Sequence, residues 1–223
     1  MREASNASEA PPLLDVRTTD RDRIPPGQSL TRKWPVLHYG GVPRVHLADW
    51  CFSVDGLVAT PLSLGYGELT ALPRHETLCD IHCVTRWSKL DNRFQGISVQ
   101  ELIRRARPRA EATHVLVHAD QGFTTNLPLT DLDRPENLLA WRHNGEDLTP
   151  DHGWPLRLVV PHLYFWKSAK WVRGFEFLAA DRPGFWERNG YHMRGDPWEE
   201  ERYGGFSVQQ WVVNKFRNAS KSR

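Results

Sequence analysis

The chain has 223 residues, of which 39% are hydrophobic and 11% aromatic, enough to bury a substantial core. Lysine and arginine number 29 against 27 aspartate and glutamate, and no basic block accompanies a recognition motif, so nucleic acid is not expected as a partner. No hydrophobic run approaches the roughly 20 residues of a membrane helix. Three cysteines without a hydrophobic leader lead us to expect reduced thiols and a cytoplasmic location.

The start of the chain differs in composition from the rest. Residues 1–32 are polar, contain proline and carry scattered charges, so we expect a flexible or surface-draped arm there. From residue 33 onward the composition is that of a globular protein, without an internal linker or repeat. The sequence therefore predicts one domain over residues 33–223.

Short hydrophobic runs with an alternating pattern predict strands at residues 50–58, 113–118, 156–160 and 172–178. Helices are fewer. A short helix is expected near residues 63–72, although two glycines weaken it. Ser98 followed by Glu101 forms a capping-box pattern before a helix that Pro108 ends, and Ser207 with Gln210 repeats this pattern near the C-terminus. The predicted fold class is α+β, mostly β, with mixed sheets and a few peripheral helices.

Residues 78–88 read LCDIHCVTRWS, and Cys83 ends the hydrophobic part of this segment. A thiolate at this position is a soft ligand that suits a heavy transition metal, and Arg86 can favour the thiolate electrostatically. The ordinary alternative is a buried cysteine that acts as a small hydrophobic residue. Zinc held by Cys79, His82 and Cys83 is a weaker alternative, because no further pair of ligands follows at a recognisable spacing.

A second pattern lies at residues 151–171, where DHGWPLRLVVP is followed by YFWKSAKW. Arg157 on a strand and a Lys-Ser-Ala-Lys turn between two strands gather cationic side chains and backbone N–H donors, which suits a phosphate. Alternatively, Arg157 pairs with a core carboxylate and Lys167 and Lys170 are solvated. Six of the ten tryptophans fall between residues 141 and 198, and we expect most of them to pack in the core rather than line a cofactor pocket.

These segments, together with KWPVLHYG at residues 33–40, resemble the molybdopterin-dependent oxidoreductases of the sulfite-oxidase-like fold, including the catalytic subunit of methionine sulfoxide reductase. The resemblance implies a molybdenum cofactor with one pterin and oxygen-atom transfer on a small sulfur- or nitrogen-containing substrate. It implies Cys83 as metal ligand, with Arg86 beside it in catalysis. The implied cofactor contacts are His38, Tyr39, Cys83, His152, Arg157, Ser168, Ala169 and Lys170.

Sulfite oxidases place a catalytic tyrosine before an Asn-Gly turn, and this chain has Trp141 there, which weakens the sulfite assignment. Since no NAD, flavin or haem motif is present, a separate redox protein is expected to donate or accept electrons. The alternative function is a non-catalytic protein of the same fold that binds an anion or a partner. A thiol enzyme using Cys83 and His82 is disfavoured, because neighbouring residues on a strand point to opposite faces.

Overall fold

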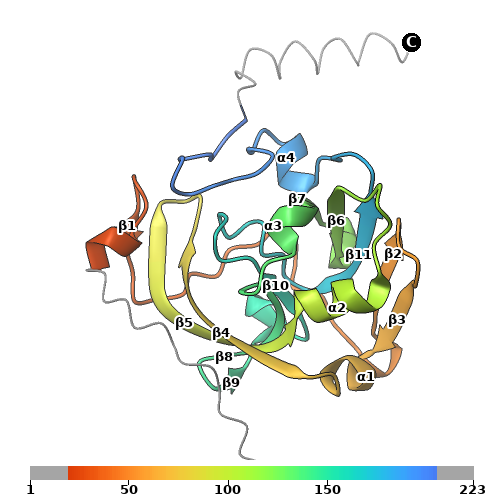
Figure 1. Ribbon diagram of the computed structural model, residues 1–223. Helices are drawn as coiled ribbons and strands as arrows, with labels where there is room; N and C mark the ends of the chain where they lie inside the picture. Colours follow the sequence, from red (N-terminus) through yellow and green to blue (C-terminus); the bar gives the residue numbers. More distant parts are fainter. Residues whose placement is uncertain (1–19, 205–223) are drawn as a thin grey trace, which may run out of the picture.

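A computed structural model describes residues 20–204 and shows two β-sheets around a shared hydrophobic core (Figure 1). The first sheet contains β1 (Ser29–Leu30), β4 (Arg74–His82), β5 (Trp87–Ser98), β8 (Leu138–His143), β9 (Glu146–Asp147) and β10 (Arg157–Val159). The second contains β2 (Cys51–Gly56), β3 (Leu62–Gly65), β6 (His114–Ala119), β7 (Thr124–Pro128) and β11 (Val172–Leu178). The helices are short: α1 (Tyr66–Thr70), α2 (Val99–Ala106), α3 (Leu129–Leu132) and α4 (Phe185–Arg188).

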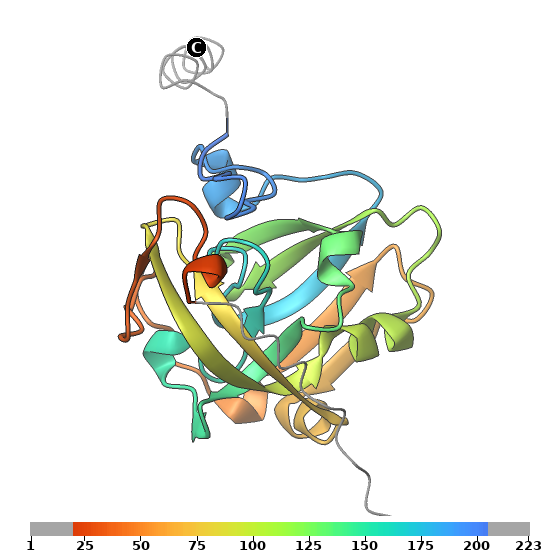
Figure 2. The ribbon, with the colours of Figure 1, turned by 60° about the vertical axis from the view of Figure 1, so that its left-hand side comes forward.

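The first sheet is built on the long β4–β5 hairpin, which curves along one side of the molecule (Figure 2). β5 also pairs with β1 in parallel and with β8 antiparallel, and β8 continues to β10. The second sheet has the order β3-β2-β11-β6-β7, in which only the β2–β11 pair is parallel. The predicted fold class is confirmed: strands dominate, the sheets are mixed and the helices lie at the periphery.

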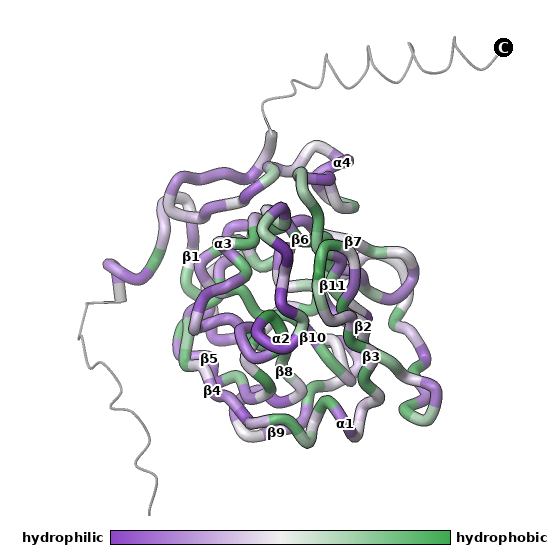
Figure 3. Tube along the Cα trace, turned by 45° about the vertical axis from the view of Figure 1, so that its right-hand side comes forward, coloured by the Kyte–Doolittle hydropathy of each residue, from purple (hydrophilic) through white to green (hydrophobic). Residues whose placement is uncertain are grey.

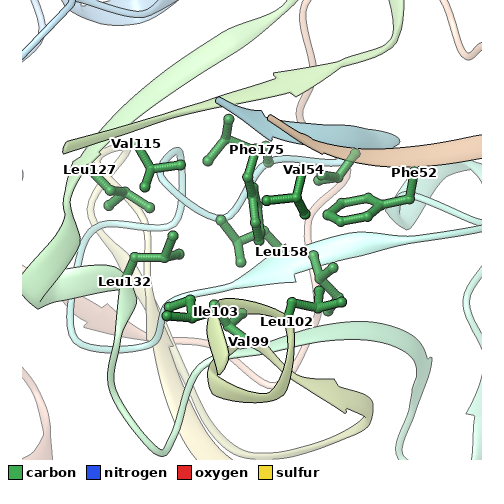
Figure 4. Close-up of a cluster of buried hydrophobic side chains, with 14 of the residues drawn as sticks. Phe52, Val54, Val99, Leu102, Ile103, Val115, Leu127, Leu132, Leu158 and Phe175 are labelled. Atoms are coloured by element: carbon green, nitrogen blue, oxygen red, sulfur yellow. The ribbon is translucent and has the colours of Figure 1, made fainter. Parts of the chain in front are cut away.

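The main core lies between the two sheets and is closed by α2. Leu102 and Ile103 of α2 face a layer that includes Phe52, Val54 and Phe175 of the second sheet (Figure 4). Hydrophobic and hydrophilic residues are interleaved along the strands (Figure 3), as expected where one face of a strand is buried. This packing joins the two sheets and so fixes the connections between them.

The predicted helix after Ser98 is confirmed. The Ser98 side chain accepts a hydrogen bond from the Gln100 N–H at 3.2 Å, and the helix ends at Arg107, whose φ of 53° lies in the left-handed region. Glu101 does not return to the start of the helix as the capping box predicts, because its carboxylate accepts hydrogen bonds from Arg104 and Arg105 instead.

The helix expected near residues 63–72 is shorter than predicted. Residues 62–65 form β3, and the helix occupies Tyr66–Thr70. It begins there because the Glu68 carboxylate accepts a hydrogen bond from the Gly65 N–H at 2.8 Å. The C-terminal helix predicted from Ser207 lies outside the described residues.

The described part of the N-terminal segment lies against the end of the β4–β5 hairpin (Figure 2). Ser29 and Leu30 pair with Trp87 and Ser88, and the Arg23 guanidinium contacts the Asp80 carboxylate at 2.6 Å. No helix in the described part of the chain combines the length and apolar character needed to cross a membrane.

Candidate cofactor site

A cavity of about 580 Å³ opens where connections from both sheets meet. Its walls come from the 34–39 segment, the β4–β5 turn, the β6–β7 turn, the β10–β11 connection and the region of α4. Seven of the nine predicted site residues line it: His38, Tyr39, Cys83, Arg157, Ser168, Ala169 and Lys170. The thiol at position 83 and the basic groups more than seventy positions later therefore share one cavity.

Cys83 occupies the tight turn between β4 and β5. Its N–H donates to the Trp87 carbonyl at 2.8 Å, and its carbonyl accepts from the Arg86 N–H at 3.0 Å. The side chain is only 8% exposed, and Sγ lies 3.1 Å from Thr85 Oγ1. Burial raises the pKa of the thiol, while the contact with Thr85 and the charge of Arg202 oppose the rise.

Arg202 and Gln28 hold this turn from outside the cavity, and the sequence did not predict either contact. Gln28 Nε2 donates to the Cys83 carbonyl at 3.1 Å, and Arg202 Nη1 donates to the Val84 carbonyl at 2.8 Å. The Arg202 guanidinium also lies 4.9 Å from the Tyr164 ring centroid. Because both partners are far from Cys83 in the chain, no local sequence pattern signals them.

Arg86 lies in the same turn, but its side chain is exposed and is not part of the cavity lining. Its φ of 72° is left-handed, as the turn requires. The cation that favours the Cys83 thiolate in this structure is Arg202. The catalytic role of Arg86 stays a prediction.

Arg157 at the start of β10 is 1% exposed, and it does not pair with a core carboxylate. Its Nη1 donates to the His152 carbonyl at 2.9 Å and its Nη2 to the Ser168 carbonyl at 3.0 Å. The guanidinium lies 4.4 Å from the Phe165 ring centroid. Burial lowers the pKa of Arg157 to about 9. A cation held in this way is costly unless an anion joins it.

Lys170 reaches the same region from the β10–β11 connection. Burial and the Arg157 charge lower the pKa of Lys170 to about 7, and its Nζ donates to the Asp151 carbonyl at 2.5 Å. Gly153, with a φ of 107°, lies between the two cations: a Cβ there would meet Arg157 Cβ and Lys170 Cβ, both at 3.1 Å. The glycine thus lets the two basic side chains approach one another.

Ser168 and Ala169 form the backbone of that connection. Ser168 Oγ accepts from the Val160 N–H at 2.9 Å, and the Ala169 carbonyl accepts from the Leu158 N–H at 2.8 Å. These bonds fold the connection back onto β10, so its position is fixed by the sheet.

Two predicted residues differ in how they reach the site. His152 does not line the cavity but stacks on Trp34, which does, with ring centroids 3.9 Å apart. His143 packs against the same ring at 4.3 Å. His38 lines the cavity, donates to the Gly40 carbonyl at 2.9 Å and contacts the Trp171 ring edge-on. The sequence did not identify Trp34 or His143.

Lys167, the first lysine of the turn, is fully buried rather than solvated. Its Nζ donates to Glu187 Oε1 at 2.6 Å, to the Met193 carbonyl at 2.6 Å and to both oxygens of Asn126 at 2.9 Å. Glu187 Oε1 also accepts from Trp166 Nε1 at 3.0 Å. This ion pair ties α4 to the cavity wall.

The expectation that most tryptophans pack in the core is wrong for half of them. Five of the ten line the cavity: Trp34, Trp87, Trp166, Trp171 and Trp186. An amphipathic indole can pack on the core with one face and form a wall with the other, so the count of tryptophans alone did not distinguish the two uses.

A family model of the oxidoreductase molybdopterin-binding domain matches residues 39–186. The chain belongs to this family. The predicted family, oxidoreductase class and molybdopterin cofactor are thereby confirmed.

Among curated proteins, the uncharacterised oxidoreductase YuiH of Bacillus subtilis is 53% identical over 190 residues, covering 84% of this chain and 96% of that protein. A sulfite oxidase of Arabidopsis thaliana is 28% identical, covering 70% of this chain and 49% of that protein. The methionine-sulfoxide reductase catalytic subunit MsrP of Ralstonia nicotianae is also 28% identical, covering 70% and 51%. The chain thus spans about half of these last two relatives.

A solved structure shows the same fold. The sulfane dehydrogenase SoxCD of Paracoccus pantotrophus superposes with a TM-score of 0.59 at 22% identity, covering 65% of this chain and 42% of that one. At this identity the likeness shows the fold alone.

The cavity fits the family's cofactor. Arg157 Nε and Trp87 Nε1 are buried without an acceptor in the described part of the chain, and both residues line the cavity. Two such donors and two cations suit an anionic ligand rich in acceptors. In the same part of the chain, no group of three or more His, Cys, Asp or Glu side chains forms a metal site, so a metal beside Cys83 would need its other ligands from a bound group.

Proposed function

We propose that the protein transfers an oxygen atom to or from a small sulfur- or nitrogen-containing substrate, with the Cys83 thiolate as the protein ligand of molybdenum. The observation that supports this most directly is the shared cavity, with a shielded thiol in one wall and Arg157 and Lys170 in another. When bound, a molybdenum–pterin group supplies oxygen-atom and two-electron transfer, while the protein supplies binding, orientation and charge.

The residues of the cavity divide that work. Arg157 and Lys170 would neutralise the phosphate of the cofactor, and the Ser168–Ala169 backbone would position it. Trp34 would form a flat wall for the pterin, held by His152 behind it, with His38 and Tyr39 at the rim. The Cys83 turn would hold the thiolate in place through Gln28 and Arg202.

We also propose a separate redox protein as electron donor or acceptor. Support comes from the relatives whose names describe them as subunits, such as MsrP of Ralstonia nicotianae. The cytoplasmic location expected from the sequence stays a proposal.

Metal content tests the ligand assignment. Expressed in a host that makes molybdopterin, the wild-type protein should carry about one molybdenum per chain, and Cys83→Ala should lose most of it, because a thiolate is the protein's contribution to holding the metal. Cys79→Ser and Cys51→Ser are matched controls, since neither cysteine lines the cavity. Inductively coupled plasma mass spectrometry measures all four proteins.

Full molybdenum in Cys83→Ala would contradict the ligand assignment. A wild-type protein without molybdenum would instead favour the alternative, a non-catalytic protein that binds an anion or a partner in this cavity. The thiol-enzyme alternative has less support, because His82 does not line the cavity and its Nδ1 lies 2.8 Å from Ser88 Oγ.

A further inference from the structure

The part of the cavity around Cys83 has a distinct composition. Cys83 and Val84 cluster with Trp166, and Trp87, Trp186 and Tyr191 pack against this cluster. All six line the cavity, and together we call them the thiol chamber. Its walls are uncharged and mostly aromatic.

The charged groups of the cavity lining are already engaged. In the described part of the chain they are Arg157, Lys170 and Asp120. Both Nη atoms of Arg157 and the Nζ of Lys170 donate to backbone carbonyls, and Asp120 Oδ1 accepts from Arg173 at 2.8 Å. The two cations are the groups that the proposed function assigns to the phosphate.

Two further arginines lie near the thiol chamber but outside the cavity lining. Arg202 donates to the carbonyls of Val84 and Pro26, and the Arg86 side chain is exposed. An inorganic anion in the chamber would therefore exchange its hydration for aromatic faces, whose quadrupole is negative, without a cation among the walls.

An aromatic path connects the chamber to solvent. The Tyr191 ring packs against Trp166 and Trp186 with centroids 5.1 and 4.9 Å apart, Trp186 contacts Phe185 at 5.0 Å, and Phe185 contacts Tyr39 at 4.5 Å. At the rim, Tyr39 is 61% and Leu37 is 50% exposed. A substrate with apolar substituents can follow this path and stay in contact with rings throughout.

Tyr191 brings a polar group to the thiol chamber. Its hydroxyl has no hydrogen-bond partner among residues 20–204, and burial, Tyr203 and Cys83 all raise the pKa of the phenol. The influence of Cys83 places the phenol near the thiol, and the hydroxyl remains a donor at neutral pH. It is available to an oxygen acceptor on a substrate.

We propose that the thiol chamber selects a neutral organic sulfoxide or N-oxide over an inorganic oxyanion, and that the Tyr191 hydroxyl donates a hydrogen bond to the oxide oxygen. This inference rests on the proposed function and specifies its substrate class. In the reducing direction the S–O or N–O bond breaks, and the oxygen leaves as water with two protons from solvent and two electrons from a reduced donor. A reduced viologen dye provides those electrons in an assay.

The test uses the molybdenum-loaded protein with methyl phenyl sulfoxide, trimethylamine N-oxide and nitrate as alternative acceptors, and with sulfite as a donor to ferricyanide. A neutral oxide should exceed both anions in kcat/KM by on the order of 100-fold, because the anions lose hydration without gaining a cation. Tyr191→Phe should lower kcat/KM for the preferred oxide about 10-fold, the typical effect of one hydrogen bond. Tyr203→Phe is the matched control, since this phenol contacts Tyr191 from outside the cavity lining.

A binding measurement supplies a readout independent of turnover. Isothermal titration of the loaded protein should show that methyl phenyl sulfone binds and sulfate does not, and Tyr191→Phe should weaken the sulfone. A loaded protein that prefers nitrate or sulfite, or that binds sulfate more tightly than the sulfone, would overturn this inference and leave the proposed function intact. Loss of molybdenum from the wild type, measured on the same samples, marks failure of the proposed function instead.

Discussion

Two histidine side chains, His143 and His152, are held neutral by their packing against Trp34. Burial and neighbouring cations lower the pKa of each to about 4. In the unfolded chain a histidine takes up its proton as the pH falls through about 6.5. The unfolded state therefore binds more protons between about pH 6.5 and 4, and stability is lost as the pH falls through this window.

The expected result is a free energy of unfolding that decreases from pH 7 towards pH 4, and a weaker decrease in the double variant His143→Gln/His152→Gln. Urea unfolding of the cofactor-free proteins at a series of pH values measures both slopes. Equal slopes in the wild type and the double variant would show that other groups cause the acid sensitivity.

At this scale the sequence identified the residues that sit in compact local patterns. Cys83, Arg157, Ser168, Ala169 and Lys170 could be found because each pattern fits within a few residues of one turn or strand. The residues that support them could not be found in this way. Arg202 contacts the Cys83 turn across 118 positions, and Trp34 meets two histidines from distant segments.

Among the elements, α4 is joined to the β10–β11 connection by the Lys167–Glu187 ion pair, in which both side chains are fully buried. The same carboxylate holds the Trp166 indole, whose ring forms part of the cavity wall. Replacing the lysine alone leaves a carboxylate buried without a counter-charge. Such a change typically costs about 3–5 kcal/mol.

We therefore predict that Lys167→Met destabilises the protein by that amount, and that Lys167→Met/Glu187→Gln is less destabilised than the sum of the two single variants. Denaturant unfolding of the four proteins gives the coupling energy. Additive effects would mean that the pair contributes no interaction beyond its separate contacts.

The sequence predicted the element types better than their limits. β11 occupies Val172–Leu178 as predicted, because a run of alternating hydrophobic residues is a local signal. The helix near residue 66 starts later than predicted, because Ser63 and Leu64 pair with β2 in the second sheet. Strand pairing of this kind depends on a partner that a local pattern does not contain.

Across the whole molecule, the cavity depends on both sheets being assembled. The Cys83 turn belongs to the first sheet, the 120–122 turn to the second, and the connection that carries Ser168 and Lys170 crosses between them. The class of fold and the family were therefore predictable from strand patterns and motifs. The cavity itself was not, because its walls are brought together only by the packing of distant segments.

The central claim is that Cys83 bonds a molybdenum atom whose cofactor phosphate lies on Arg157 and Lys170. Crystals of the loaded wild-type protein, measured on both sides of the molybdenum absorption edge, test it most directly. We predict an anomalous peak at bonding distance from Cys83 Sγ, with phosphate density against the Arg157 and Lys170 side chains. A peak at Cys79 or Cys51, or a phosphate located away from the two cations, would contradict the account.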